Sequence, residues 1–135
     1  MSSGPMTIFD LAQQGLSAQS VRMNAAASNL ANAGAVAGSA AAAYLPLRPV
    51  FAEELDRKSG LATVKVKGVY RTAAAPVKEH DPGHPLADAN GDVYAAPVDE
   101  NGEMVEMLDS SRQYQNLVEA LSTAKDLILQ TVRMK

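Results

Sequence analysis

Both ends of the chain carry large apolar residues at a strict seven-residue spacing, and this pattern limits the possible folds more than any other feature. In the first part of the sequence the spacing is kept by Phe9, Leu16, Met23 and Leu30. In the last part it is kept by Met107, Tyr114, Leu121 and Ile128. Heptad spacing is typical of a helix that packs along a partner helix through one seam. The sequence therefore predicts two long helices, each with an apolar seam.

The residues around each seam indicate where the helices begin and end. The first is expected from about Thr7 to Ala33, because glycines interrupt the pattern after that point. The second is expected from about Glu103 to Arg133, with acidic residues before it and basic residues at its end, as the helix dipole favours. The predicted fold class is mainly α, with two long terminal helices paired as an antiparallel coiled coil and a small β-hairpin or extended-loop segment in the middle.

The middle of the chain shows weaker signals. Residues 61–71 alternate apolar and polar side chains, with β-branched residues among them, which predicts a strand. Residues 44–51 are a candidate partner strand that Pro46 and Pro49 restrict to a sheet edge, and residues 56–60 supply a turn.

These signals define a domain organisation in three parts. Residues 1–6 are expected to be a flexible N-terminus, and residues 7–33 and 99–135 form a helical coiled-coil domain. Residues 34–98 are a loop and β-hairpin insertion. Within it, residues 75–97 are rich in Pro, Gly, Asp and Asn and are expected to form an extended loop.

Charge is nearly absent from the first part of the chain. Up to Ala52 the only charged residues are Asp10, Arg22 and Arg48. Hydrophobic residues make up 47% of the chain, but 24 of them are alanines. Burial of an alanine removes little apolar area from water. A solvated helix usually carries Glu and Lys on its outer face, so more than one face of the first helix is expected to pack against protein. We interpret the uncharged surface as an intersubunit surface.

Composition excludes several classes of function. The balance of 12 basic and 15 acidic residues provides no electropositive surface for nucleic acid. The absence of Cys excludes disulfides, thiolate metal sites and thiol catalysis. No apolar run approaches the roughly 20 residues needed to cross a bilayer, and the first ten residues do not resemble a secretory signal. Export from the cytoplasm is therefore expected to use no cleaved signal peptide.

Two segments of the middle offer possible metal ligands. His80, Asp81 and His84 could hold a metal ion if the loop folded back on itself, but we expect a Pro-Gly turn with solvated side chains. Asp88 opens a stretch like the start of a calcium loop, but the twelfth position is Asp99 rather than Glu, so an Asx turn is expected. No nucleophile elbow, phosphate-binding glycine motif or catalytic carboxylate pair is found. The chain is predicted to be no enzyme and to hold no metal or cofactor.

Short motifs in the two helical segments resemble a known family. Residues 18–19, 22–24 and 27–33 resemble the N-terminal signature of bacterial flagellar axial proteins of the rod and hook class. Residues 102–107 and 111–115 look like the C-terminal signature of the same class.

A third motif narrows the resemblance. The loop Asp81–Val93 is similar to the stretch that marks the C-type proximal rod subunit, and the short chain also fits that subunit. The matches together cover about residues 6–47 and 80–134.

The resemblance implies a structural subunit of the flagellar basal-body proximal rod. Such subunits assemble helically with other axial proteins into the drive shaft and export channel for motility. The implied partners are copies of the chain, other rod proteins, the membrane-ring or rod adaptor, distal rod proteins and the flagellar type III export apparatus, with no nucleic acid or small-molecule substrate. The implied location is the basal body, spanning the periplasm. A non-flagellar coiled-coil adaptor, a secretion-system structural component and a small metal-dependent enzyme are the alternatives.

The expected subunit contacts lie on the seams and at the end of the first helix, where Ser28, Asn29, Leu30 and Asn32 are expected to form a subunit junction. The full set of expected contact residues is Phe9, Leu16, Met23, Ser28, Asn29, Leu30, Asn32, Met104, Met107, Arg112, Tyr114, Leu121 and Ile128.

Overall fold

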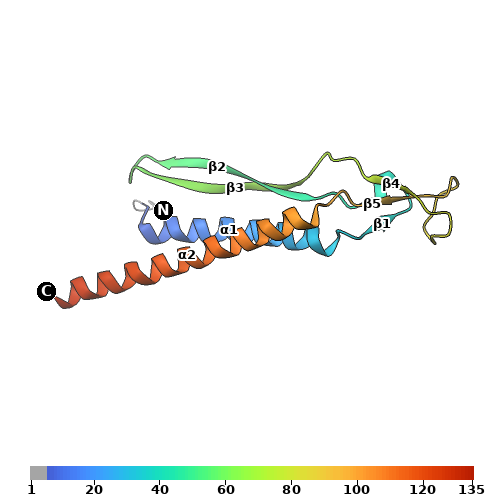
Figure 1. The fold of residues 1–135 in the computed structure, drawn as a ribbon. Helices are drawn as coiled ribbons and strands as arrows, with labels where there is room; N and C mark the ends of the chain where they lie inside the picture. The colour runs from blue at the N-terminus through green and yellow to red at the C-terminus, as the bar shows by residue number, and fades with distance from the viewer. Residues whose placement is uncertain (1–5) are drawn as a thin grey trace.

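The structure, a computed structural model, describes residues 6–135 and is an elongated stack of two helices and a β-ribbon (Figure 1). The helices are α1 (Ile8–Ala31) and α2 (Glu100–Arg133). The ribbon is formed by β2 (Leu47–Asp56) and β3 (Leu61–Arg71). The remaining elements are β1 (Val36–Ala37), the 3-10 turn Ala40–Ala42, β4 (Val77–His80) and β5 (Asp92–Ala95). The predicted flexible N-terminus falls on residues 1–5, which lie outside the described part, and on Met6, whose N–H donates to Asp56 Oδ2 at 3.1 Å.

The predicted fold class is wrong, because the middle of the chain is rich in β structure. Of the described residues 6–135, 47% are helical and 24% are in strands, which form two antiparallel sheets of three and two strands. The three-stranded sheet has the order β1-β5-β4 and contains part of the segment predicted as an extended loop. Sequence reasoning missed β4 and β5 because each has only four residues, too few to show a period of two.

Local hydrogen bonds explain why α1 begins at Ile8. The Thr7 hydroxyl accepts a hydrogen bond from the Asp10 backbone N–H at 3.2 Å, and the Asp10 carboxylate accepts one from the Thr7 N–H at 2.8 Å. This reciprocal capping box satisfies backbone donors that have no partner inside the helix. The Asp10 pKa is lowered by these contacts, first by the Thr7 backbone.

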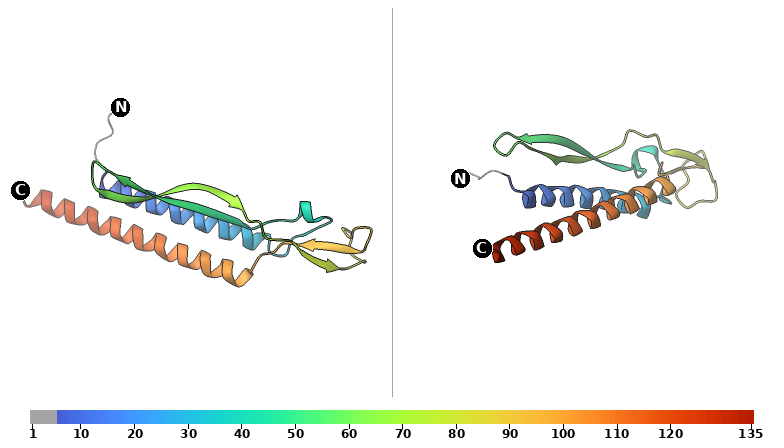
Figure 2. Two further views of the ribbon diagram at one scale, coloured as in Figure 1. Left: turned by 90° about the horizontal axis from the view of Figure 1, so that it is seen from above. Right: turned by 60° about the vertical axis from the view of Figure 1, so that its left-hand side comes forward.

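The two helices run antiparallel, and α2 extends beyond the beginning of α1 (Figures 1 and 2). The Gln19 side chain donates to that of Gln113 at 3.0 Å, and a Cβ added to Gly15 would lie 3.0 Å from Leu117 Cδ1. In this register the first residue of α1 lies opposite α2 at about Ala124. The last turns of α2 therefore have no α1 residue beside them.

The β2–β3 ribbon covers a second face of α1. Its register runs from the pair Leu47 and Arg71 to the pair Asp56 and Leu61, and a positive φ of 70° at Gly60 closes the turn. The strand predicted at residues 61–71 is confirmed as β3. Both strands contact α1, so that α1 lies between the ribbon and α2 (Figures 1 and 2).

Candidate functional site

The seam of α2 is covered along most of the helix and then becomes exposed. Its first six positions are buried or half-buried: Met107, Ser110, Tyr114, Leu117, Leu121 and Ala124. The next position, Ile128, is 47% exposed. The change occurs next to the first residue of α1, so the heptad pattern of α2 continues past the partner helix that the chain itself supplies.

The seam of α1 is covered by both neighbours rather than by α2 alone. Leu16, Met23 and Leu30 are half-buried, whereas Phe9 is 41% exposed. The buried apolar residues of α1 are the small ones, Ala18, Ala25 and Ala26, which are at most 5% exposed. Alanines allow the two neighbouring elements to approach the helix closely.

A third stripe of α1 faces outwards and carries no charge. It has a heptad-like spacing and consists of Gln13, Ser17, Ser20, Asn24, Ala27 and Ala31, all of them exposed except the half-buried Ser20. One face of α1 packs against α2 and a second packs against the chain's own β2–β3 ribbon. The third stripe is the uncharged surface of α1 that remains exposed.

Arg22 links the two helices near the middle of their contact. Its Nε donates to Glu106 Oε1 at 2.7 Å and one terminal nitrogen to Asp109 Oδ2 at 2.9 Å, while the other donates to Gln19. The Glu106 contact raises the Arg22 pKa, and Arg22 in turn lowers the pKa of Asp109. The isolated positive charge of Arg22 in an otherwise uncharged stretch was the available sequence signal for this role.

The predicted junction residue Asn29 is fully buried and bonded within the chain. Its Nδ2 donates to the Leu47 carbonyl at 3.0 Å, and its Oδ1 accepts from Leu47 N–H at 2.7 Å and from Tyr44 Oη at 2.8 Å. Ser28 Oγ lies 3.0 Å from the same Tyr44 oxygen, and Asn32 Nδ2 donates to the Ser28 carbonyl at 2.8 Å. These contacts fix the start of β2 against the end of α1.

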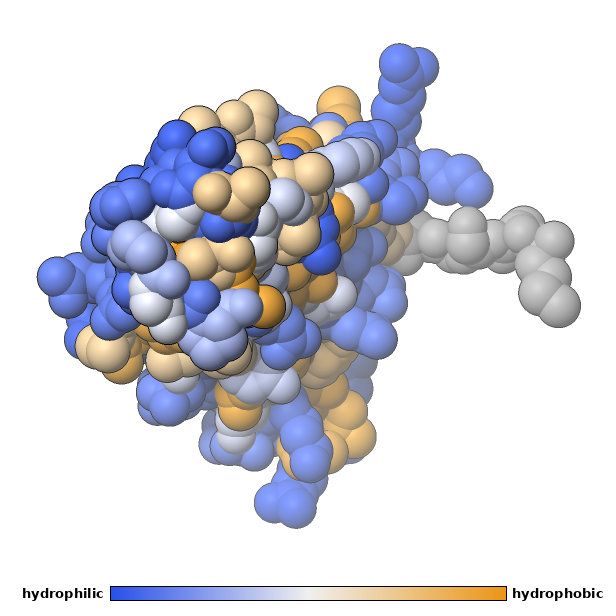
Figure 3. Space-filling view, turned by 90° about the vertical axis from the view of Figure 1, so that its right-hand side faces the viewer, coloured by the Kyte–Doolittle hydropathy of each residue, from blue (hydrophilic) through white to orange (hydrophobic). Residues whose placement is uncertain are grey.

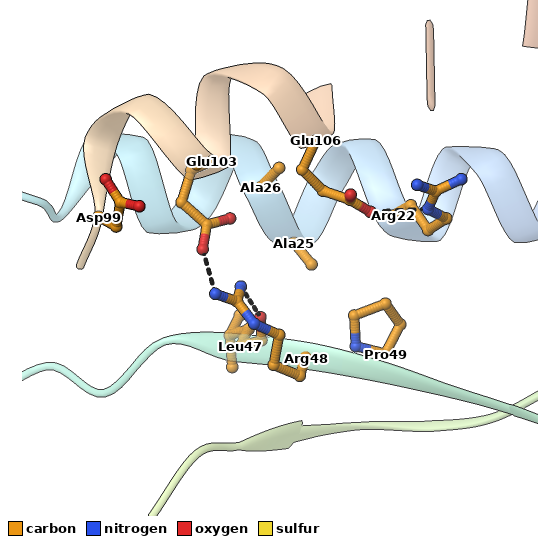
Figure 4. Close-up of a pocket in the computed structure, with 10 residues that line it drawn as sticks. Arg22, Ala25, Ala26, Leu47, Arg48, Pro49, Asp99, Glu103 and Glu106 are labelled. Carbon is orange, nitrogen blue, oxygen red and sulfur yellow. Dashed lines mark hydrogen bonds and ion pairs between the residues drawn. The ribbon is translucent and has the colours of Figure 1, made fainter. Parts of the chain in front are cut away.

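A charged cavity lies between the same elements, close to the first turns of α2 (Figure 4). Glu103 is 2% exposed, and its Oε1 forms an ion pair of 2.5 Å with Arg48, which is 51% exposed. Glu103 Oε2 is buried and has no hydrogen-bond partner among the described residues. Sequence reasoning used Glu103 as part of a signature and as an acidic residue at the start of the last helix, and it did not predict its burial.

The outer faces of α2 display many large apolar side chains. Three predicted contact residues on α2 are exposed: Met104 at 51%, Ile128 at 47%, and the charged Arg112. The others, absent from the predicted contact set, are Val105, Leu108, Val118, Leu127, Leu129, Val132 and Met134. No described helix is long and apolar enough to cross a membrane. Soluble monomers rarely expose an apolar surface of this extent, so this surface of α2 is a candidate for contact with another protein.

The opposite end of the molecule is different in character. Figure 3, which looks onto the end where the three-stranded sheet lies, shows hydrophilic side chains mixed with weakly hydrophobic ones. Asp92 holds this hairpin together: it binds Lys78 Nζ at 2.8 Å and His80 Nδ1 at 2.9 Å. The two contacts lower the Asp92 pKa, with Lys78 as the larger cause.

The side chains considered as possible metal ligands in residues 80–88 make hydrogen bonds within the chain. The Asx turn predicted at Asp88 is confirmed, because its Oδ1 accepts from the N–H groups of Asn90 at 2.8 Å and Asp92 at 2.9 Å. His84 Nδ1 accepts from Leu86 N–H at 3.0 Å. Within residues 6–135 no group of three His, Cys, Asp or Glu side chains is arranged to hold a metal ion.

Comparisons with a family model and with individual proteins all match flagellar basal-body rod proteins. A family model described as "Flagellar basal body rod FlgEFG protein C-terminal" matches residues 89–134. The chain is 44% identical over 131 residues to the flagellar basal-body rod protein FlgC of Salmonella typhimurium, covering 96% of both chains. It is 40% identical over 129 residues to FlgC of Yersinia enterocolitica, again covering 96% of both, and 34% identical over 123 residues to FlgC of Agrobacterium fabrum, covering 90% of this chain and 88% of that protein.

Proposed function

The chain belongs to the FlgC family of flagellar basal-body rod proteins, and we propose that it is a structural subunit of the proximal rod. One observation carries the structural part of this proposal: the α2 seam continues beyond α1 and is open from Ile128 onwards. An elongated subunit with an unfilled seam at one end can accept a neighbour by a head-to-tail contact. A contact of this kind that does not close into a ring generates a helical filament.

The proposed subunit contacts divide into two groups by their place in the structure. Phe9, Met104, Arg112 and Ile128 have exposed side chains and are proposed to touch neighbouring subunits directly. The other predicted contact residues lie at least half-buried within the chain, and they act by fixing the shape of the surface that is presented: Leu16, Met23, Ser28, Asn29, Leu30, Asn32, Met107, Tyr114 and Leu121.

The finer features of this function are also proposals. The subunit assembles with copies of itself, other rod proteins, the ring or adaptor proteins and the distal rod, and it lies in the basal body where the rod spans the periplasm. It leaves the cytoplasm through the flagellar type III apparatus without a cleaved signal. It acts as part of a shaft and channel and catalyses no reaction. The family membership does not favour a coiled-coil adaptor outside the flagellum.

Deletion and complementation test this function. Cells that lack the chain are expected to form no rod beyond the inner-membrane ring and to be non-motile, and the wild-type gene is expected to restore both. Immunogold labelling of purified basal bodies should place the chain in the rod. Intact rods in the deletion strain would contradict the proposal.

A further inference from the structure

An open groove of about 980 Å³ lies between the first half of α1 and the outer half of the β2–β3 ribbon. We call it the tip groove. Along α1 it extends from Thr7 to Ser17, which is about 15 Å at 1.5 Å per residue. Ser17 also belongs to the uncharged third stripe of α1. The tip groove and this stripe are therefore continuous.

The ribbon side of the tip groove presents apolar side chains to solvent. Leu55 and Val64 line it and are 60% and 46% exposed, and Val66 beside them is half-buried. An exposed apolar groove next to an uncharged helix stripe is the kind of surface into which an amphipathic helix packs.

The end of α2 that extends beyond α1 has a matching length. This free end covers residues 124–134, which is again about 15 Å of helix. Leu127 and Leu129 lie about 200° apart around the helix, so a single seam contact cannot cover both. The exposed apolar side chains of the free end are Leu127, Ile128, Leu129, Val132 and Met134.

The free end of α2 cannot reach the tip groove of its own chain. The free end and the tip groove lie at the same end of the molecule, but α1 lies between α2 and the ribbon (Figure 1). A free end that occupies the groove therefore comes from another copy. Because two different surfaces meet, the contact is heterologous and can be repeated from copy to copy.

The charges of the two surfaces are complementary. Residues 127–135 carry Arg133 and Lys135 and no acidic residue. The tip groove is lined by three carboxylates and two lysines, and the carboxylates of Asp10 and Glu54 are exposed, so an incoming cation can reach them. Complementary charge at the rim of a contact favours the correct partner and register.

We propose that the tip groove receives the free end of α2 from a second copy of this chain. The proposal rests on the proposed function, which supplies the assembly of copies. The incoming helix lies antiparallel to α1, as the chain's own α2 does, and its apolar side chains cover Leu55 and Val64. In this register the two copies are displaced along their long axis by about 15 Å, the length of the free end.

Paired cysteines test the proposal, because the chain has no cysteine of its own. Val64→Cys and Val132→Cys are introduced into two differently tagged copies, which are expressed together in the deletion strain. A short bismaleimide added to purified basal bodies is expected to join the two tagged copies.

Two matched controls use exposed valines outside the proposed contact. Val69→Cys replaces the groove partner and lies on β3 outside the groove, and Val105→Cys replaces the helix partner and lies near the start of α2. Each control pair is expected to give little product. No product from Val64→Cys with Val132→Cys, or an equal yield from either control pair, overturns the proposal.

A photo-cross-linker identifies the occupant without requiring a particular cysteine geometry. Benzoylphenylalanine in place of Val64 is expected to attach to residues 124–135 of another copy, as shown by mass spectrometry of the cross-linked peptide. Attachment to a different protein, or to another part of the chain, overturns the proposal.

A substitution in the groove tests whether its apolar wall holds the helix. Leu55→Ser should lower the bismaleimide yield at least about tenfold, because the contact loses the burial of one large apolar side chain. Leu55 is exposed in the isolated chain, so the melting temperature of that chain should not change. Val69→Ser is the control and should leave the yield unchanged. Equal losses from the two variants overturn the proposal.

Failure of this inference can be told apart from failure of the proposed function. A chain that is absent from purified basal bodies contradicts both. Intact rods that contain the chain but give no product between Val64→Cys and Val132→Cys reject the contact alone, and the structural role in the rod stands.

Discussion

At the scale of single residues, three buried or half-buried polar side chains connect segments that are far apart in the sequence. Asn29 joins the end of α1 to the start of β2, Arg22 joins α1 to α2, and Glu103 joins α2 to Arg48 on β2. A polar group that is buried without a partner is costly. The polar contacts therefore define how the three layers are placed, while apolar burial contributes comparatively little, because the fully buried apolar side chains of residues 6–135 are four alanines, Pro46 and Val93.

Substitution of Asn29 tests this role. Asn29→Ala removes three hydrogen bonds and takes from the Leu47 N–H the acceptor that Asn29 supplies, so the free energy of unfolding should fall by about 2–3 kcal/mol. Asn32→Ala is the matched control, because its side chain bonds only a carbonyl of its own helix end, and its loss should be below about 1 kcal/mol. Urea titration followed by circular dichroism measures both. Equal losses would contradict the role given to Asn29, and normal rods and motility in the double variant would argue against any junction function.

Asp92 makes the β4–β5 hairpin sensitive to acid. Lys78 and His80 lower the Asp92 pKa in the folded chain, so its contribution to stability is complete above the unfolded value of about 3.9 and is lost as the pH falls through the lower folded value. The protection of the β4 and β5 amides against exchange, measured relative to the intrinsic exchange rate at each pH, should therefore fall below about pH 4. Asp92→Asn should remove this pH dependence, whereas Asp126→Asn on the exposed face of α2 should not. A hairpin equally protected at pH 3 and pH 6 would refute the assignment.

At the scale of secondary-structure elements, α1 is shaped by having a neighbour on two sides. Ala18 and Ala25 are seven residues apart and buried, and Ala26 lies beside them at 1% exposure. The ribbon and α2 can both approach α1 because these side chains are small. The scarcity of charge in this helix, which carries only Asp10 and Arg22, follows in part from the same arrangement, since a charged side chain without a partner on either covered face would lose its hydration.

Enlarging an alanine on a covered face should push the layers apart. Ala26→Leu adds three carbons at a site that is 1% exposed, and the chain is expected to lose about 1–3 kcal/mol of stability. Ala27→Leu, one position further on the exposed stripe, is the control and should change stability by no more than about 0.5 kcal/mol. Thermal melts of the two variants make the comparison. Similar melting temperatures would mean that the helix contacts are looser than the structure indicates.

At the scale of the whole molecule, the chain is a long subunit whose apolar surface is only partly covered by its own elements. The side chains of α2 that face away from α1 are rich in exposed Leu, Val, Ile and Met, whereas the end near the three-stranded sheet is mixed in character (Figure 3). An open apolar surface of this kind is stabilised when a neighbour covers it. The shape and the surface together suit a subunit of an extended assembly.

The open end of the α2 seam should matter for assembly and not for the fold of the chain. Ile128 lies beyond α1 and is exposed, so Ile128→Ser should change the stability of the isolated chain by no more than about 0.5 kcal/mol. Rod assembly and motility should nevertheless be lost. Leu121→Ser, one heptad earlier and half-buried against α1, should destabilise the isolated chain as well. Circular dichroism melts and motility assays give the two readouts. Full motility with Ile128→Ser would show that the open seam is not a subunit contact.

The sequence by itself determined the features that depend on local pattern. Heptad spacing located both helices, alternation located β3, and the turn predicted at Asp88 forms where the sequence indicated it. The terminal signatures also identified the family, because a sequence motif can be recognised without knowledge of the fold.

Only the tertiary structure decided how each face is used. The heptad pattern of α1 could not reveal that the chain's own ribbon covers its second face, since that contact joins Asn29 to a strand that begins at Leu47. The short strands β4 and β5 form because the Asp88 turn and the Asp92 ion pairs bring them together, and four residues show no period alone. The burial of Glu103 depends on α1, β2 and α2, which are far apart in the sequence and come together only in the fold. Such contacts are set by packing geometry, which a one-dimensional pattern does not contain.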